Sequence, residues 1–253
     1  MLEVVRMKDV VFKYPNGFSL FVKKFIVKDN EFVGIIGPNG SGKTTFLRLI
    51  LGLLKPLRGE VRLFGKDVKK MRRKEIAKRI TMVSQDFSPI YDFKVKDIVL
   101  TGRIPYKGIF ATENEEDLKI MRESLKIVGL EGYEERRYWS LSGGERRRVL
   151  IAKALAQRTS VIVLDELTAH LDPKYMLEIS DVLKKLVDGG KTVIAAFHNI
   201  NVASRVCNRL VALKEGRIIA SGEPKEIVRE DILESLYGIK LRVLKERPPQ
   251  VLF

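Results

Sequence analysis

The stretch Gly37–Thr44 reads Gly-Pro-Asn-Gly-Ser-Gly-Lys-Thr, a spacing of glycines, lysine and threonine that suits the binding of phosphate groups. Glycines let backbone N–H groups converge on a phosphate because no Cβ stands in the way. Lys43 can then reach the outer phosphates of a nucleotide as a point charge, and the Thr44 hydroxyl can bind Mg²⁺. The alternative is a glycine turn at the start of a helix, which the complete octapeptide disfavours. We therefore predict a nucleotide-phosphate site here.

The residues on either side of this loop predict the elements that hold it. Phe32–Ile36 is a continuous apolar run, typical of a buried strand, and residues 45–51 carry apolar side chains three and four apart, as a helix does. We expect this helix to continue until Lys55 and Pro56 end it. A strand, a glycine-rich loop and a helix in this order place the phosphate at a helix N-terminus, where the helix dipole favours an anion.

Polar residues follow the other predicted core strands in the same way. These are, in chain order, Gln85 after strand 80–83, Asp165 and Glu166 after strand 161–164, and His198 after strand 192–197. Because ligands of open parallel sheets bind beyond the carboxyl ends of the strands, we expect these side chains to gather beside the phosphate loop. Nucleotide hydrolysis needs a carboxylate for the metal, a group that positions water and a contact to the γ-phosphate. Taken singly, each could instead be a cap, a loop residue or a satisfied core histidine.

The rest of the chain predicts an α/β fold with a mostly parallel sheet, an N-terminal antiparallel β subdomain and an inserted helical lobe. The expected elements are strands in 1–32, a strand at 59–64 followed by a basic helix, helical segments in 86–157, a helix from Pro173 to Gly189, a hairpin about Glu215 and Gly216, and short C-terminal helices. We predict a single domain, 1–253, in which 1–85 and 158–253 form the core and 86–157 the helical subdomain.

One more motif decides the class of nucleotide-binding protein. Leu141–Glu145 reads Leu-Ser-Gly-Gly-Glu and precedes both a predicted helix and the strand that ends in Asp165 and Glu166. With this motif and the phosphate loop together, the sequence resembles the ATP-binding cassette (ABC) ATPases along essentially its whole length. The resemblance implies a P-loop NTPase core, ATP and Mg²⁺ as cofactors, and hydrolysis of ATP to ADP and phosphate.

The resemblance also implies a role for each matching residue. Tyr14 matches the aromatic residue that stacks on adenine, and His198 matches the histidine that contacts the γ-phosphate. Gln85 matches the glutamine that reaches Mg²⁺ and the attacking water. Asp165 matches the carboxylate that holds Mg²⁺ through water, and Glu166 matches the catalytic carboxylate. The residues that would hold the phosphates in this chain are Gly37, Pro38, Asn39, Gly40, Ser41, Gly42, Lys43, Thr44 and Thr45. Ser142, Gly143 and Gly144 would bind the γ-phosphate of ATP held by a second copy, so that two ATP molecules lie between two subunits.

Some positions depart from the family pattern. Leu167 stands where the family commonly has proline, Asn199 replaces a frequent aspartate after His198, and Arg147 occupies a place often held by glutamine. None of these changes removes a reacting group. A narrower similarity, carried by Thr101–Tyr106, by residues 168–172 and by the tail at 236–239, is to ATPase subunits of importers for iron–siderophores, haem and cobalamin. Within the wider family, residues 169–172 match the segment that crosses the dimer interface.

This similarity implies partners and a place in the cell. The chain would pair with a second copy beneath two integral membrane permease subunits, at the cytoplasmic face of the membrane, and serve an extracytoplasmic binding protein indirectly. We expect the segment Asp86–Tyr106 to dock the permease, with Tyr91, Phe93 and Arg103 as candidate contacts. The alternative for the aromatic residues is that they pack the helical lobe.

Composition limits the other function classes. The 253-residue chain has a formal net charge of +15 and a single cysteine, Cys207, which excludes an internal disulfide. No apolar run is long enough to span a membrane, and the first residues read as a strand rather than a secretory leader. The positive charge leaves open a soluble ABC-type ATPase that acts on nucleic acid, but the basic run Lys66–Arg79 lacks interleaved aromatic residues, so we expect no nucleic acid partner. A P-loop kinase would not need Leu141–Glu145.

Overall fold

The parallel half of the central sheet is built from short, fully apolar strands. In the computed structural model, which describes residues 2–15, 17–84, 87–107, 112–165, 173–244, 246 and 248–252, these strands are β3 (Phe32–Ile36), β6 (Ile80–Val83), β7 (Val161–Asp165), β8 (Thr192–Phe197) and β9 (Arg209–Lys214). They lie in the order β9-β3-β8-β7-β6 and run parallel. Their continuous apolar sequences suit strands that are covered on both faces. The predicted core strands are therefore confirmed, and β7 includes Asp165 as well.

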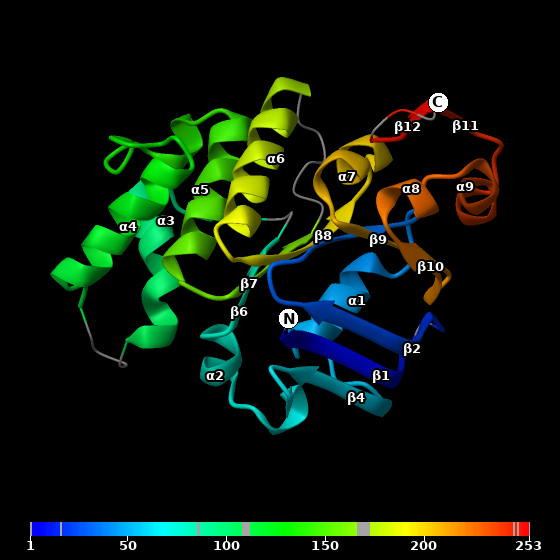
Figure 1. The fold of residues 1–253 in the computed structure, drawn as a ribbon. Helices are drawn as coiled ribbons and strands as arrows, with labels where there is room; N and C mark the ends of the chain where they lie inside the picture. Colours follow the sequence, from blue (N-terminus) through cyan, green and yellow to red (C-terminus); the bar gives the residue numbers. More distant parts are fainter. Residues whose placement is uncertain are drawn as a thin grey trace.

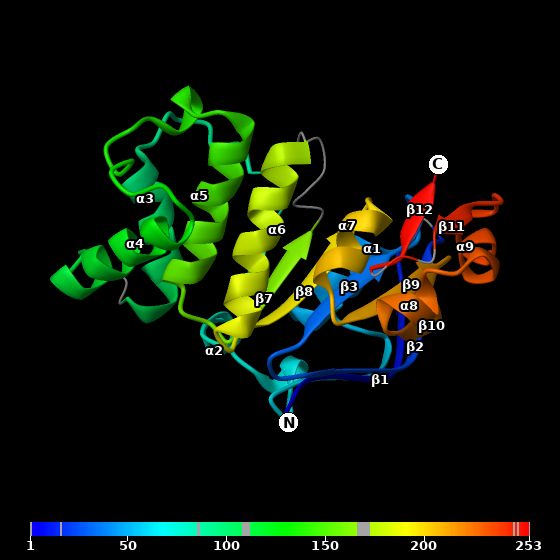
Figure 2. The same cartoon turned by 45° about the horizontal axis from the view of Figure 1, so that its top comes forward.

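The antiparallel half of the sheet comes from the first part of the chain. Its strands are β1 (Glu3–Lys13), β2 (Ser19–Lys28), β4 (Arg58–Leu63) and β5 (Lys66–Asp67). It joins the parallel half through β10 (Arg217–Gly222), which pairs with β2 on one side and with β9 on the other. The result is one ten-stranded sheet that curls round on itself (Figures 1 and 2). The predicted α/β fold with an antiparallel subdomain is thus confirmed.

Alternate residues of the core strands pack against different layers of helices. On one face, Val33 and Ile35 of β3 belong to the same apolar cluster as helix α1 (Lys43–Ile50) and strands β1 and β2, so α1 is enclosed between the two halves of the sheet. On the other face, Phe32 and Ile36 pack with α6 (Pro173–Asp188) and α7 (Ile200–Val206). The helix that we expected from Pro173 is confirmed. None of the helices in the described part of the chain has both the length and the apolar run that a membrane crossing requires.

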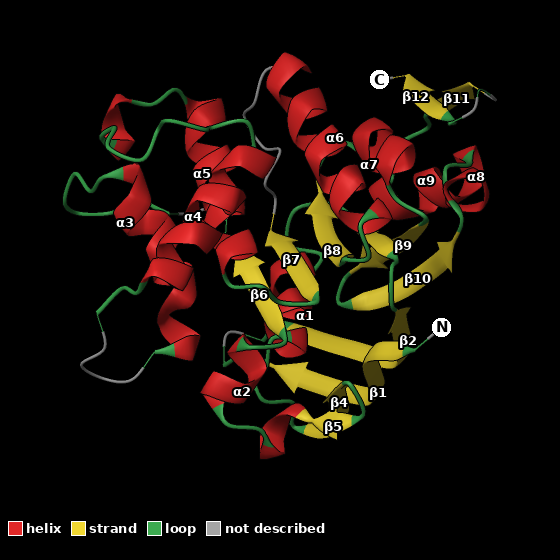
Figure 3. Cartoon of the chain, turned by 60° about the vertical axis from the view of Figure 1, so that its left-hand side comes forward, coloured by secondary structure: helices red, strands yellow, loops and turns green. Residues whose placement is uncertain are grey.

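The named elements in the described part of the chain between β6 and β7 are all helices, joined by loops. These are α3 (Val95–Leu100), the 3₁₀ helix η2 (Thr101–Tyr106), α4 (Glu115–Ile127), the 3₁₀ helix η3 (Tyr138–Ser140) and α5 (Gly143–Ala156). They form a lobe beside the sheet (Figure 3), in which α5 lies between α4 and α6 (Figures 1 and 2). The subdomain bounds 85/86 and 157/158 stay predictions, since Gln85 and Asp86 lie outside the described residues.

Two expectations about helices are wrong. The helix after the phosphate loop ends at Ile50 rather than near Lys55, because the N–H groups of Leu53 and Leu54 both return to the carbonyl of Arg48 and close the helix. The basic run Lys66–Arg79 is not one helix but β5, the 3₁₀ turn η1 (Val68–Lys70) and the short helix α2 (Arg73–Ala77). Like charges spaced four apart along this run would oppose a longer helix.

The C-terminal part contains the predicted short helices and, in addition, a hairpin that the sequence did not predict. The helices are α8 (Pro224–Ile227) and α9 (Glu230–Tyr237), and the hairpin consists of β11 (Arg242–Leu244) and β12 (Gln250–Leu252). The Asn201 side chain of α7 pairs with both backbone groups of Val251, donating at 3.0 Å and accepting at 2.7 Å. This pairing attaches the hairpin to the helix that follows His198.

Candidate functional site

The loop between β3 and α1 has the form of a phosphate cradle. Gly42 is the N-cap of α1 and has φ of 102°, a conformation that glycine adopts without strain. A Cβ on Gly42 would also come within 2.7 Å of the Phe18 ring. No side chain caps the start of α1, and its first turn holds no acidic residue. The N–H groups and the positive end of the helix dipole therefore face the loop, where a phosphate would bind.

Two buried side chains of this loop, Lys43 and Ser41, are placed so that they could bind a nucleotide phosphate. Lys43 is buried, and its Nζ donates to the carbonyls of Gly37 at 3.0 Å and Pro38 at 3.2 Å, so the charge is held at the mouth of the loop. The buried Ser41 Oγ has no hydrogen-bond partner among the described residues. A buried hydroxyl without a partner is costly, and a phosphate oxygen would supply one. The loop therefore fits the phosphates of ATP.

The structure brings together two of the predicted Mg²⁺ ligands. The Thr44 hydroxyl of α1 lies 3.2 Å from Oδ1 of Asp165, at the end of β7. Both groups offer oxygen, which Mg²⁺ prefers, and a site of one or two such groups usually relies on phosphate and water for its other ligands. These two residues therefore fit a magnesium ion that is bound together with ATP.

His198 lies at the same edge of the sheet. It directly follows β8, whose last residue, Phe197, is paired in register with Ile36 just before the phosphate loop. The His198 side chain is exposed. The next residue, Asn199, caps α7 by accepting from the N–H groups of Asn201 at 3.0 Å and Val202 at 3.2 Å. Asparagine in place of the family's aspartate thus provides a normal helix start.

The Leu141–Glu145 motif, which we call the signature motif, forms the start of α5 (the signature helix) in the helical lobe. Ser142 and Glu145 form a capping box, in which the Glu145 N–H donates to Ser142 Oγ at 3.2 Å and the Ser142 N–H donates to Glu145 Oε2 at 2.8 Å. The bond from the Ser142 backbone, helped by the hydroxyls of Ser142 and Tyr133, holds the pKa of Glu145 below its ordinary value. In the described chain, the hydrogen bonds of Ser142 go to Glu145 and Arg146 and none goes to the phosphate loop.

Tyr14 lies in an aromatic cluster beside the phosphate loop. It is half-buried and makes an edge contact with Phe12, with ring centroids 4.7 Å apart, and a tilted contact with Phe18 at 6.3 Å. Phe18 in turn packs against Gly42. Phe18 is not among the predicted site residues; the Tyr14 N–H donates to the Phe18 carbonyl at 2.9 Å, which holds the two residues together. An aromatic pair therefore stands next to the loop, where a nucleotide base would need stacking partners.

Some predicted site residues lie outside the described residues. They are Gln85, Glu166, Leu167 and the segment 169–172. The ends of the strands that lead to Gln85 and Glu166 are described, and both lie at the edge of the sheet that carries Asp165. The roles of Gln85 and Glu166 stay predictions.

A family model confirms the resemblance to the ABC ATPases. The model described as "ABC transporter" matches residues 22–169, which is more than half of the chain. The chain belongs to the ABC transporter family. The cassette is accordingly an ATPase of that family, and its fold is the ABC ATPase fold.

Individual relatives agree with this assignment. The cassette is 37% identical over 248 residues to the petrobactin import ATP-binding protein FpuC of Bacillus anthracis, which covers 97% of this chain and 91% of the relative. It is 35% identical to the ferric enterobactin transport ATP-binding protein FepC of Escherichia coli, covering 92% of this chain and 86% of the relative. Among solved structures, it resembles the dimeric post-hydrolysis state of the ATP-binding cassette MJ0796 bound to ADP and Pi, with a TM-score of 0.73, 35% identity, and coverage of 87% of this chain and 98% of that chain.

Proposed function

We propose that this cassette is the ATP-hydrolysing subunit of an importer for a metal chelate, namely an iron chelate, haem or cobalamin. Two copies close around two ATP molecules beneath two membrane permease subunits, at the cytoplasmic face of the membrane. The observation that carries the proposal is the division of the site. The phosphate loop and the Thr44–Asp165 pair lie on the core, whereas Ser142 lies on the helical lobe with no hydrogen bond to that loop.

Within one copy, the core binds the nucleotide. Lys43 would exchange its loop carbonyls for the outer phosphates, and Ser41 would donate to a phosphate oxygen. Thr44 and Asp165 would hold Mg²⁺, which would supply positive charge to neutralise the phosphates. Glu166 accepts the proton of the attacking water, and Gln85 and His198 orient that water and the γ-phosphate. Water is excluded only when the second copy covers the site.

The second copy completes the site with the start of α5. Gly143 is exposed, and a Cβ built on it would meet nothing within 4 Å. The Ser142 hydroxyl and the first N–H groups of α5 can therefore face an anion on another molecule. The dimeric state of the similar cassette MJ0796 supports this arrangement.

Exposed apolar side chains on the lobe form the proposed permease surface, which we call the docking patch. Its members are Ile90, Tyr91, Phe93 and Trp139. Ile90 is 92% exposed and Tyr91 73% exposed, so neither packs the lobe, whereas Phe87 is partly buried against Tyr138. Contiguous exposed apolar side chains typically mark a protein interface.

Arg103 does not belong to this surface. We expected it as a solvent-facing contact, but its residue is only 6% exposed and its guanidinium is bonded inside the lobe. The expectation is wrong because Gly102 packs on the last turn of α5 and the Arg103 side chain points to the Ala156 carbonyl there.

The docking patch is attached to the residues just before the signature motif. The Tyr138 N–H donates to the Phe93 carbonyl at 2.9 Å, the Trp139 N–H donates to Asp92 Oδ1 at 3.2 Å, and Arg137 Nη1 donates to the Asp92 carbonyl at 2.7 Å. A permease that moves the patch would therefore move the start of α5 with it.

Mixed dimers test the shared site. Neither Lys43→Ala nor Ser142→Arg subunits should hydrolyse ATP alone. A mixture should recover part of the wild-type rate, because some mixed dimers contain one site with an intact Lys43 and an intact Ser142. Activity that stays at the level of the separate variants would contradict the shared site.

Purification from native membranes tests the transport assignment. The tagged cassette should bring down integral membrane subunits, and a variant with Tyr91 and Phe93 replaced by alanine should bring down fewer. Salt-sensitive binding to DNA with no membrane partner would favour the nucleic-acid alternative instead.

A further inference from the structure

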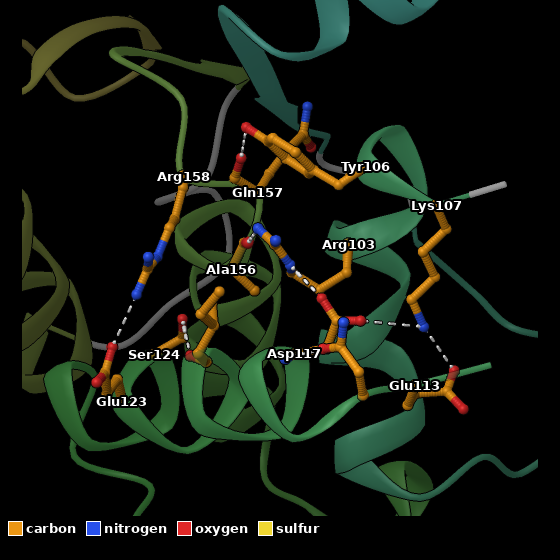
Figure 4. A network of polar contacts seen from close by, with 12 residues as sticks. Arg103, Tyr106, Lys107, Glu113, Asp117, Glu123, Ser124, Ala156, Gln157 and Arg158 are labelled. Atoms are coloured by element: carbon orange, nitrogen blue, oxygen red, sulfur yellow. Dashed lines mark hydrogen bonds and ion pairs between the residues drawn. The ribbon is translucent and has the colours of Figure 1, made fainter. Parts of the chain in front are cut away.

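The carboxyl end of the signature helix α5 is held by side chains from η2. Arg103 Nη1 donates to the Ala156 carbonyl at 2.9 Å, and the Tyr106 hydroxyl donates to the Gln157 carbonyl at 2.9 Å. The last carbonyls of a helix have no partner within the helix and carry the negative end of its dipole. A buried guanidinium suits this position both as donor and as cation. Figure 4 shows both bonds reaching the end of α5 from the same short segment.

The charge of Arg103 is itself balanced inside the lobe. Arg103 Nε donates to Asp117 Oδ1 at 2.8 Å, and the two side chains are only 7% and 6% exposed. The Tyr106 ring lies 4.2 Å from the guanidinium carbon, and Lys107 approaches Asp117 at 3.6 Å. Removing one member of a buried ion pair is costly, whereas the pair need not be more stabilising than apolar packing. Arg103 is therefore better explained by the position that it enforces than by the stability that it adds.

Gly102 allows η2 to lie directly on the last turn of α5. A Cβ at this position would come within 2.3 Å of the Lys153 carbonyl and 3.2 Å of the Gln157 nitrogen. Any other residue would push η2 away from α5 and lengthen the bonds from Arg103 and Tyr106. The Gly-Arg-x-Pro-Tyr run thus contains a residue for close approach and two residues that hold the end of α5.

Gln157 connects the same end of α5 to the sheet. Its Oε1 accepts from the Thr81 hydroxyl of β6 at 2.7 Å, and its Nε2 donates to the carbonyl of Ala77 at 2.5 Å and, at 3.5 Å, to that of Ile80. The backbone carbonyl of Gln157 is bonded to η2 and its side chain to β6, so this residue lies where the lobe meets the core.

We propose that Arg103 and Tyr106 form a clamp that makes residues 87–106, which we call the docking segment, and the signature helix α5 one rigid body, which pivots on the core at Gln157. This inference deepens the proposed function and rests on it. Residues 92–96 are bonded to 134–139 near the start of α5, and η2 is bonded to its end. The docking segment therefore holds α5 at both ends. Since α5 has 14 residues, a small rotation at Gln157 moves Ser142 at the far end of a lever of about 21 Å.

Arg103 and Tyr106 are positioning residues in this scheme, because neither touches the phosphate loop. Weakening the clamp should therefore disturb the Ser142 half of the site and leave the ATP-binding core unchanged. We expect Arg103→Lys to lower kcat for ATP about tenfold, in the usual range of coupling effects, while KM changes less than about twofold. Arg103→Lys keeps the charge beside Asp117 but cannot reach both Asp117 and the Ala156 carbonyl with the same geometry.

Two further variants keep the kinetic test interpretable. Tyr106→Phe removes only the bond to Gln157 and should fold normally, with a smaller fall in kcat of about threefold and an unchanged KM. Arg158→Lys is the matched control, since Arg158 lies at the same end of α5 and pairs only on the surface with Glu123 at 3.2 Å. It should leave both constants unchanged. If Arg103→Lys and Tyr106→Phe behave like this control, or if KM rises in proportion to the fall in kcat, the clamp does not position α5.

Amide hydrogen exchange on the full chain tests the clamp without relying on ATP hydrolysis. In Arg103→Lys, exchange should accelerate at residues 142–146, at the far end of α5, and stay unchanged at residues 43–50 of α1. A merely local, stabilising role would confine the change to residues 100–107 and 153–157, and that result would overturn the proposal. If the far end responds but no variant or wild-type protein is stimulated by membrane partners, the clamp stands and the proposed transport function fails.

Discussion

The core around α1 and the helical lobe around α5 are held together by different kinds of interaction. Helix α1 is enclosed by apolar side chains, and Phe46, Leu47, Leu49 and Ile50 are fully buried between the two halves of the sheet. The lobe also has an apolar interior, but it contains the buried Arg103–Asp117 ion pair, the capping box of α5 and the exposed docking patch.

This difference fits different tasks. Close packing on all sides gives the phosphate loop a fixed frame, because dense interiors do not deform continuously. Directional bonds instead specify one orientation of α5 relative to the docking segment. Changes in the core should therefore abolish chemistry, whereas changes in the lobe should alter how the chemistry responds to a partner.

Loss of Lys43 should have the largest effect. In Lys43→Ala the phosphate loop loses its buried cation, and ATP hydrolysis should fall by about 10²–10³ or more, as when a charge-stabilising donor is removed. Steady-state phosphate release measures this, with the unfolding temperature as a check that the fold is intact. Lys55→Ala, on the exposed surface beyond α1, is the matched control and should hydrolyse ATP normally. Normal turnover in a folded Lys43→Ala protein would refute the site.

Loss of the predicted general base should greatly slow ATP hydrolysis but leave ATP binding intact. Glu166→Gln should slow hydrolysis by about 10²–10⁴, because a positioned base contributes that much. Since ATP still binds, the variant should accumulate as a dimer when ATP is present. Size-exclusion chromatography with and without ATP measures this. A monomer under both conditions would count against the shared site and would weaken the contrast between core and lobe.

Changes in the docking patch should distinguish the role of the lobe from that of the core most clearly. Replacing Tyr91 and Phe93 by alanine should leave the ATPase activity of the isolated chain intact and lower its stimulation by the permease about tenfold, the effect expected of interface hot spots. Leu57→Ala, a change of an exposed apolar residue on the core, is the control and should leave stimulation unchanged. Equal losses in the isolated and the assembled protein would show that the patch belongs to the site or the interior of the lobe.

The smallest of the expected effects is a loss of stability at acidic pH, caused by protonation of Asp117 in the lobe. Burial alone would raise the pKa of Asp117, but bonds from Arg103 and the Asn114 backbone, and the charge of Lys107, outweigh it and lower the pKa. A carboxyl whose pKa is lowered by folding stabilises the fold at pH values above its unfolded pKa, about 3.9. That contribution is lost as the pH falls through the lower, folded pKa.

An Asp117→Asn variant checks this acid response. It should be less stable at neutral pH and should lose less stability than the wild type between about pH 4 and pH 2. Urea unfolding at a series of pH values measures the difference. Glu116 precedes Asp117 in α4 and is exposed, so Glu116→Gln is the control for a nearby surface carboxyl. Parallel pH profiles for Asp117→Asn and wild type would contradict the assignment.

The sequence alone determined those features whose cause is local. Phe32–Ile36 and Thr192–Phe197 have the predicted bounds because an apolar run of five or six residues is typical of a strand that is covered on both faces. The phosphate loop was predictable because its glycine and lysine spacing encodes its own backbone shape, and the Thr44–Asp165 contact follows from parallel strands that end at one edge.

Only the tertiary structure decided the features that depend on distant partners. The sequence Gly-Arg-Ile-Pro does not show that Arg103 is buried, because burial of a guanidinium requires acceptors such as Asp117 and the Ala156 carbonyl, which are distant in the chain. Phe18 likewise became a neighbour of the phosphate loop only when the β1–β2 turn folded over Gly42. The C-terminal hairpin depends on Asn201, some 50 residues earlier, for its attachment to α7. Local patterns specify strands and loops, whereas burial of a polar group depends on the partner that folding brings to it.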